Sequence, residues 1–523
     1  MTYAIIGRVS EESGKIITTL RRRRELEAAL RALRTARDDD ELDAQARALA
    51  QQGAPVLAAI LRSLDTADPR LIGALGKVAM YLERSDTVAA LRAAARDPRR
   101  TDRERMSAIL ILDRFLGEEV EEGLFQGLRD PNAVARESLQ EVMAQARSNR
   151  GIWIEYLEQL AEQPDDVPFL VMQTLLDLDE EGSVEPLRLL AQDPQEATAR
   201  EAIRRLGAIR RPEAAAALRS LLPTLAPPLR ALAERALRKL QLSGIRLDPL
   251  PAPGSEWRAL VTPVDGAGNQ AVWIIGRRPR ERYCRFLGLL LDDQHGIRDA
   301  VGNDRMRAQQ LPPRRPVGSI LALSPAGASG RYVLFLETTF AYAQRVVLQS
   351  LAHNFASGTP TPLVYRLLNP YLWGHEIAPL PAAEPCVASP SLLPQTPELL
   401  DHPALEGWFI HVPALYDLGE RVLAGRQADV ASTLAAILNE NLDATRRARY
   451  RRRLEAVREW LLAAQEPRLA ELAATAAATL EEGAPTEHPF LWRMAEIGLE
   501  VAMDNLRSGL DLRRGASEPR WNV

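Results

Sequence analysis

The chain has very little cysteine, since Cys284 and Cys386 are the only two among 523 residues. Two thiols cannot form a disulfide framework, and their separation of about a hundred residues does not match the paired spacing of zinc ligands. The sequence therefore predicts neither a disulfide-stapled fold nor a zinc site. The scarcity of thiols is also consistent with a reducing compartment.

Long apolar runs are missing as well. No stretch reaches the roughly 18 consecutive apolar residues that a membrane span requires, and residues 1–15 lack the apolar centre of a signal peptide. We therefore expect a cytoplasmic protein that has no membrane partner.

The sequence carries no large excess of charge of either sign. The 66 basic residues nearly balance the 70 acidic ones, which leaves a formal net charge of −4. A protein that binds nucleic acid over its whole surface needs a basic excess, so the overall charge argues against that class. Aromatic residues make up only 5% of the chain while hydrophobic residues make up 46%. This composition favours Ala- and Leu-rich helix packing over a β sandwich.

The first half of the chain contains a regular series of proline turns. Intervals of 29 to 33 residues separate Pro69, Pro98, Pro131, Pro164, Pro194 and Pro227. Segments with helical apolar spacing flank each turn, so the fixed period predicts stacked helix pairs that share one core. The stripe Ala199, Ala202, Ile203 and Leu206 is an example of this spacing. Four of the prolines follow Asp, which predicts an Asp N-cap and a Pro at the start of the second helix.

Two of these segments carry a resemblance to a known repeat family. Residues 129–139 (RDPNAVARESL) and 192–209 (QDPQEATAREAIRRLGAI) resemble the HEAT-like repeats of bacterial proteins, including the short-period class found in phycobilisome lyases. The resemblance covers residues 52–243 and implies an α-solenoid that binds other proteins. It does not specify the function, because scaffolds, lyases and DNA-repair proteins share such repeats.

The remaining chain changes character at two Pro-rich stretches, 247–254 and 379–397, which we interpret as linkers. The resulting fold class is multidomain and mainly α, a HEAT-like α-solenoid followed by a small α+β domain and a C-terminal helical bundle. We expect four parts: an N-terminal helical cap over 1–51, the α-solenoid over 52–245, the α+β domain over 255–376 and the bundle over 398–510.

The α+β domain is predicted from four strand-like runs, 257–264, 271–277, 283–291 and 331–336, which two helices follow. The glycines of residues 265–270 suit a hairpin turn between the first two strands. A nucleotide-binding loop is disfavoured there, because the G-x-G-x-x-G spacing is missing and no helix opens after the loop. No cofactor is therefore expected.

Candidates for catalysis are few. Asp292, Asp293 and His295 follow the third predicted strand, and His375 with Glu376 ends the domain. Such groups can bind a hard cation or act as a general base only if they converge. Ordinary turn composition explains the same residues, so we expect no catalytic residue and no metal site.

Arginine-rich segments supply the candidates for binding. The second helices of the repeats offer exposed charged positions for a protein partner: Arg136, Glu137, Arg200, Arg204 and Arg205. A denser cluster surrounds Tyr450 and offers an alternative site for a polyanion, with Tyr450 available for stacking. It consists of Arg446, Arg447, Arg449, Arg451, Arg452 and Arg453. Another basic cluster is expected on a hairpin loop at 277–285, and a basic docking arm at 21–24 is an alternative to the N-terminal cap.

These features together predict a non-enzymatic scaffold or adaptor that holds a protein partner on the solenoid surface. A nucleic-acid-associated protein that uses the arginine clusters is the first alternative. The second alternative is an enzyme whose site lies within residues 255–376, for which the sequence offers no motif.

Overall fold

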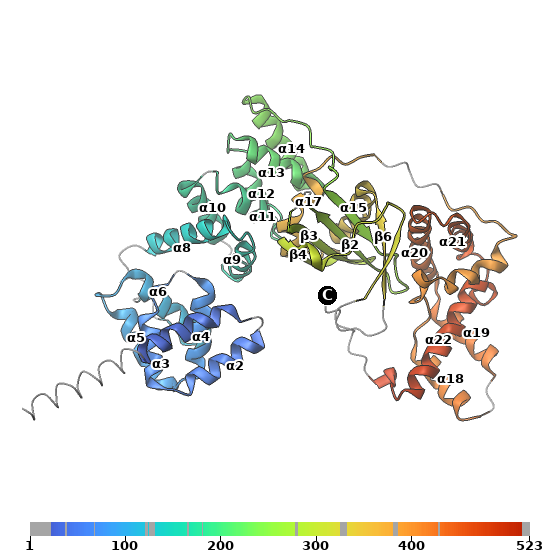
Figure 1. The fold of residues 1–523 in the computed structure, drawn as a ribbon, viewed down its shortest axis with the longest axis horizontal. Helices are drawn as coiled ribbons and strands as arrows, with labels where there is room; N and C mark the ends of the chain where they lie inside the picture. The colour runs from blue at the N-terminus through green and yellow to red at the C-terminus, as the bar shows by residue number, and fades with distance from the viewer. Residues whose placement is uncertain are drawn as a thin grey trace, which may run out of the picture. The chain divides into compact units, whose positions relative to one another are not determined.

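The computed structural model divides the chain into two compact units, Met1–Gly182 and Ser183–Val523 (Figure 1). It describes residues 22–36, 39–66, 68–120, 124, 131–164, 167–179, 181–277, 281–324, 332–379, 385–426 and 429–514. The chain is mainly helical, with a small antiparallel sheet between the repeat helices and the C-terminal helices along the sequence, so the predicted fold class is confirmed. None of the helices in the described ranges is long and apolar enough to cross a membrane.

The first unit consists of short helices around one apolar core. Residues 22–32 are helical, and the following elements are η1 (Leu33–Thr35), α2 (Asp39–Ala50), α3 (Ala54–Arg62), α4 (Pro69–Met80), α5 (Arg84–Arg96), α6 (Asp102–Leu110), η2 (Ile111–Phe115), α8 (Pro131–Ala146), α9 (Ile152–Ala161) and α10 (Val167–Leu178). Leu30, Ile60, Leu75 and Leu91 are fully buried in its core. Side chains from separate helices thus share one core, as stacked helix pairs require.

The predicted helix start at an Asp-Pro pair is confirmed at the first turn, Asp68-Pro69. Asp68 accepts hydrogen bonds from the amides of Arg70 and Leu71 at 3.1 and 3.4 Å, and α4 begins at Pro69. The carboxylate therefore satisfies amides that have no partner inside the helix. Asp130 lies outside the described residues.

At two other turns the predicted helix start was wrong. Asp97 accepts a hydrogen bond from the amide of Arg99, and α6 begins only at Asp102, where Thr101 is the N-cap in a reciprocal capping box with Glu104. Asp193 likewise binds the amide of Gln195. Each Asp closes a local turn around its own proline, so a later residue becomes the N-cap.

The second unit opens with the last repeat helices: α11 (Val184–Leu190), α12 (Glu196–Leu206), α13 (Pro212–Leu221), η3 (Leu222–Thr224) and α14 (Pro227–Leu242). The predicted α12 stripe is confirmed, because Ala199, Ala202, Ile203 and Leu206 are all 0% exposed. On α14, in contrast, Leu237 is buried while Leu229 and Leu232 are half-buried. Ala233 and Leu240, which share the helical spacing of Leu229 and Leu232 in the sequence, are also buried, so part of that stripe faces the core.

A six-stranded antiparallel sheet follows, in the order β4-β3-β2-β1-β6-β5. Its strands are β1 (Trp257–Val261), β2 (Asn269–Gly276), β3 (Tyr283–Asp292), β4 (Gly296–Arg307), β5 (Ile320–Leu323) and β6 (Val333–Thr338). The predicted hairpin is confirmed, since β1 pairs with β2 and Val261 lies opposite Val272. The strands β4 and β5 were missed, because both lie at the edges of the sheet and carry exposed residues where a central strand is apolar.

Three helices cover the sheet, α15 (Phe340–Ser357), α16 (Leu363–Leu368) and α17 (Pro370–Trp373). Ala343, Val347 and Leu351 recur at helical spacing in the sequence, and all three lie on the buried face of α15 at 0% exposure. The helix α15 packs on β1, β3 and β4, while α16 packs on β3 and β4. The α+β part is thus a sheet with helices packed against it, as the sequence predicts.

The C-terminal part contains η5 (Leu393–Asp401), η6 (Pro403–Leu405), α18 (Pro413–Leu423), α19 (Val430–Asn441), α20 (Ala444–Ala463), α21 (Pro467–Thr479), η7 (Pro485–Glu487), α22 (Pro489–Arg507) and η8 (Leu512–Arg514). The core face of α20 follows the helical spacing of the sequence, because it carries Leu454, Val457, Trp460 and Leu461, all 0% exposed.

Two tryptophans attach the C-terminal part of the chain to the sheet, Trp460 from α20 and Trp408 from the segment before α18. The indole N–H of Trp460 donates to the carbonyl of Val261 at 2.9 Å, and that of Trp408 donates to the carbonyl of Val264 at 3.0 Å. Both acceptors belong to the end of β1 or the turn after it. The four-part division of the chain stays a prediction, while Ser183–Val523 forms one compact unit.

Candidate functional site

The predicted partner-facing residues lie on two helices that belong to different compact units. Arg136 and Glu137 are exposed on α8 in the first unit, whereas Arg200, Arg204 and Arg205 lie on α12 in the second. Glu137 accepts a hydrogen bond from Arg103 of α6 at 2.8 Å, and the same arginine binds a second carboxylate of α8. The charge of Glu137 therefore already links two neighbouring helices.

The three arginines of α12 pair with carboxylates of their own helix. Arg200 binds Glu196, while Arg204 and Arg205 both bind Glu201, at 3.5 and 2.9 Å. Pairs of this kind at the protein surface stabilise a helix only slightly, so they open at low cost when a partner offers better contacts. The face opposite the buried stripe of α12 is thus a charged surface with Arg204 60% exposed.

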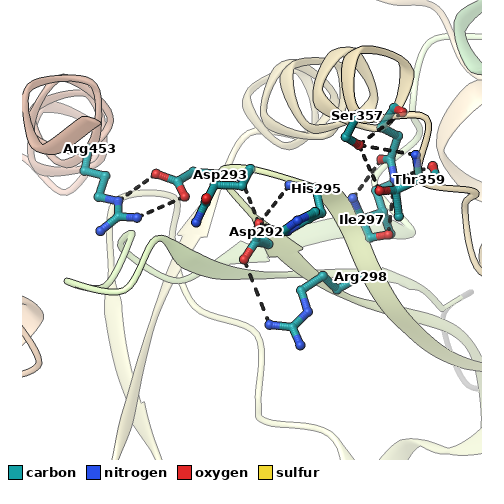
Figure 2. A network of polar contacts seen from close by, with 10 residues as sticks. Asp292, Asp293, His295, Ile297, Arg298, Ser357, Thr359 and Arg453 are labelled. Atoms are coloured by element: carbon teal, nitrogen blue, oxygen red, sulfur yellow. Dashed lines mark hydrogen bonds and ion pairs between the residues drawn. The ribbon is translucent and has the colours of Figure 1, made fainter. Parts of the chain in front are cut away.

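The acidic residues at the end of β3, Asp292 and Asp293, do not converge on a common point (Figure 2). Asp292 is 8% exposed, and its Oδ1 accepts hydrogen bonds from the amides of Gln294 and His295, both at 2.8 Å. The same oxygen lies 3.0 Å from Nδ1 of His295. Burial raises the pKa of Asp292, but these hydrogen bonds outweigh it and hold the pKa below its usual value. Asp292 therefore closes the β3–β4 turn.

Asp293 points the other way, toward α20 (Figure 2). Its two carboxylate oxygens accept hydrogen bonds from Arg453 at 2.6 and 3.0 Å. Among the described residues no group of three or more His, Cys, Asp or Glu side chains is placed to hold a metal ion.

His375 lies among aromatic rings. The ring of His375 makes edge contacts with Trp257 and Phe340, with centroids 5.0 and 5.3 Å apart. Burial lowers the pKa of His375. The residue therefore takes part in packing between β1 and α15.

The six arginines of α20 have different surroundings. Arg453 is buried against Asp293, Arg447 donates to the carbonyls of Glu481 and Gly483, and Arg451 lies 3.6 Å from both Glu455 and Glu481. Arg449 and Arg452 have no carboxylate partner among the residues that the structure describes. The helix therefore does not present six free cations, and the polyanion site at these residues stays a prediction.

The face of α20 that carries Arg446, Arg449 and Arg453 lines a cavity of about 220 Å³. Its other lining residues are Ile410, His411, Val412, Asn441, Leu442 and Tyr450. Sequence reasoning missed His411 and Asn441, which come from other segments and carry no motif. The spacing i, i+3 and i+7 was nevertheless readable, because it places the three arginines on one side of a helix.

Comparison with known proteins supports the repeat character of part of the chain. Residues 153–238 match the family model of HEAT repeats. This segment contains the helices α10 to α13 and most of α9 and α14. No curated protein and no solved structure matches the chain.

Proposed function

We propose that the protein is a non-enzymatic scaffold or adaptor that holds a protein partner on the exposed surface of its HEAT-repeat helices. The observation that carries this proposal is the match of residues 153–238 to HEAT repeats. HEAT repeats generally serve protein interaction, because stacked helix pairs bury one face and leave long charged faces free.

The helix α12 separates a buried apolar face from an exposed charged face on this surface. Its apolar stripe is completely buried, and Arg200 and Arg204 extend from the opposite face. Arginine is a frequent anchor in protein interfaces because its planar guanidinium binds carboxylates with two hydrogen bonds. We therefore infer an acidic surface on the partner of α12, while Arg136 and Glu137 contribute a separate contact on α8.

The test compares two charge reversals in the full chain. Arg200→Glu combined with Arg204→Glu reverses the α12 surface, and Arg507→Glu is the matched control. Arg507 on α22 is 57% exposed and pairs with Asp504 three residues earlier, much as Arg204 is 60% exposed and pairs with Glu201.

Quantitative affinity purification from the native host is the measurement. A protein that co-purifies with the wild type and with the Arg507→Glu control, but is lost from the α12 variant, supports the proposal. The same partners at the same yield for all three proteins would contradict the assignment of α12.

A further inference from the structure

The cavity lined by α20 carries positive charge. Three of its nine lining residues are arginines, and none of the described residues that line it is acidic. Arg446, Arg449 and Arg453 follow one another at i, i+3 and i+7 on α20, which places the three cations along one wall of the cavity. Like charges this close repel one another, so an anion between them relieves the repulsion.

Among the described residues, a carboxylate pairs with only one of these three arginines. Asp293 holds Arg453 in an ion pair. Arg446 donates to neutral groups, the backbone carbonyl of Asn441 at 2.7 Å and its side-chain oxygen at 3.4 Å, so these contacts orient the guanidinium without pairing it with a carboxylate. Asp443 accepts a hydrogen bond from the amide of Arg446 and caps the helix. Arg449 completes the set, without a carboxylate partner among the described residues.

The walls of the cavity are held by packing on several sides. The amide of Ile410 donates to the carbonyl of Met494 on α22 at 3.1 Å, which fixes the segment that carries His411. The ring of Tyr450 lies 6.0 Å from that of Trp408, and the guanidinium of Arg453 covers its face. The buried side chains of Ile410 and Leu442 make part of the lining apolar, which strengthens charge interactions inside. A site that is preorganised in this way spends little free energy on ordering when it binds a ligand.

The size of the cavity and the hydrogen-bond partners of the other arginines on α20 favour a compact anion over a chain of phosphates. Nucleic acid would need a continuous basic stripe along the helix. Arg447 and Arg451 are instead directed to acceptors at residues 481–483 and 455, away from such a stripe. A cavity of about 220 Å³ suits a small molecule.

We propose that this cavity binds a small molecule that carries phosphate, with Arg446 and Arg449 as its two main cationic contacts. A guanidinium can donate two parallel hydrogen bonds to phosphate, and two of them can hold one dianionic group. This site is separate from the α12 surface. The experiment below can therefore contradict phosphate binding without contradicting the scaffold proposal.

The test measures binding of pyrophosphate and of a sugar phosphate to the full chain by calorimetry, with citrate as a carboxylate probe and a single-stranded oligonucleotide as a polyanion probe. Arg449→Gln removes one proposed contact, and no hydrogen bond from Arg449 to another described residue is lost. Arg452→Gln is the matched control, because Arg452 is exposed on the same helix and does not line the cavity.

We expect at least one phosphate probe to bind, with affinity about tenfold weaker in Arg449→Gln and within about twofold of wild type in Arg452→Gln. Arg449→Lys should recover part of the loss, since it keeps the charge without the paired donors. No phosphate binding up to about 10 mM, equal affinity in Arg449→Gln, or tighter binding of citrate would each overturn the proposal. Oligonucleotide binding that both Gln variants weaken equally would also overturn it in favour of a polyanion surface.

Discussion

Arg453 of α20 donates to both carboxylate oxygens of Asp293, a residue 160 positions earlier in the chain (Figure 2). The side chain of Arg453 is only 6% exposed, and it also donates to the carbonyl of Gly266 in the β1–β2 turn. The neighbouring Gly268 has a φ of +98°, and a Cβ there would collide with Asp293 and Arg453. The glycines of the predicted hairpin therefore also make room for an ion pair between the sheet and the C-terminal helices.

Breaking this pair should destabilise the second unit. Asp293→Asn removes the negative charge and leaves the guanidinium of Arg453 buried beside a neutral amide. We expect the free energy of unfolding to fall by about 2 kcal/mol, less than for a completely buried pair because Asp293 is 21% exposed. Urea denaturation followed by tryptophan fluorescence measures the change.

An exposed ion pair serves as the control for this prediction. Arg468 and Glu398 are 69% and 48% exposed and lie 2.7 Å apart. Glu398→Gln should therefore change the free energy of unfolding by less than about 0.5 kcal/mol. Equal effects of the two substitutions would show that the Arg453–Asp293 pair is not effectively buried.

Arg188 holds the repeat helices of the second unit to its α+β part. It is 4% exposed and donates to the carbonyls of Arg366 and Leu367 and to the side-chain oxygen of Asn369, at 2.8 to 2.9 Å. Arg188→Met keeps the aliphatic volume but leaves these acceptors without their donor, which should cost about 3 kcal/mol.

The loss of this contact should be visible in limited proteolysis. We expect Arg188→Met to accelerate cleavage near residues 247–254, because α11 to α14 would no longer be fastened to α16. Arg204→Met on the exposed face of α12 is the control and should leave the cleavage rate unchanged. A wild-type rate in Arg188→Met would mean that other contacts are sufficient to hold these helices.

His488 should make stability depend on pH. Burial lowers the pKa of His488 from 6.5 to about 4, and its Nε2 lies 3.0 Å from the hydroxyl of Thr479. Between pH 6.5 and 4 the unfolded chain binds a proton that the folded protein excludes, so stability falls as the pH decreases through this range. Between pH 7.5 and 5.5, His488 therefore lowers the free energy of unfolding by about 1.3 kcal/mol.

The substitution His488→Gln isolates this contribution. Glutamine does not titrate and keeps a polar group near Thr479, so the pH dependence of the free energy of unfolding should become shallower by that amount. Every other residue is the same in both proteins, so the difference between the two pH profiles reports on position 488. An unchanged pH profile would indicate that His488 protonates in the folded state at its ordinary pKa.

The shared core of the repeats can be tested at Ile203 and Leu206, both completely buried on α12. Substitution of either by Asp places a charge in the stack and should cost more than about 3 kcal/mol. Protease resistance of the full chain should fall for both variants, whereas Arg204→Asp on the exposed face should behave as wild type. Unchanged resistance in Ile203→Asp and Leu206→Asp would contradict a packed α12.

The sequence by itself determined the helical stripes of this protein. The stripes of α12, α15 and α20 were readable because burial on a helix follows a local period of 3.6 residues, and the core faces match it. The β1–β2 hairpin was readable for a similar reason, since its turn chemistry is contained in a few adjacent residues.

Only the tertiary structure decided which partners the charged side chains bind. An arginine is long and flexible, so its partner depends on which distant segment approaches it, as Asp293 does for Arg453 and the end of α16 for Arg188. The edge strands β4 and β5 depend likewise on pairing with neighbours rather than on their own residues. The cavity on α20 combines residues 410–412, 441–442 and one helix face, and no local pattern could have brought these segments together.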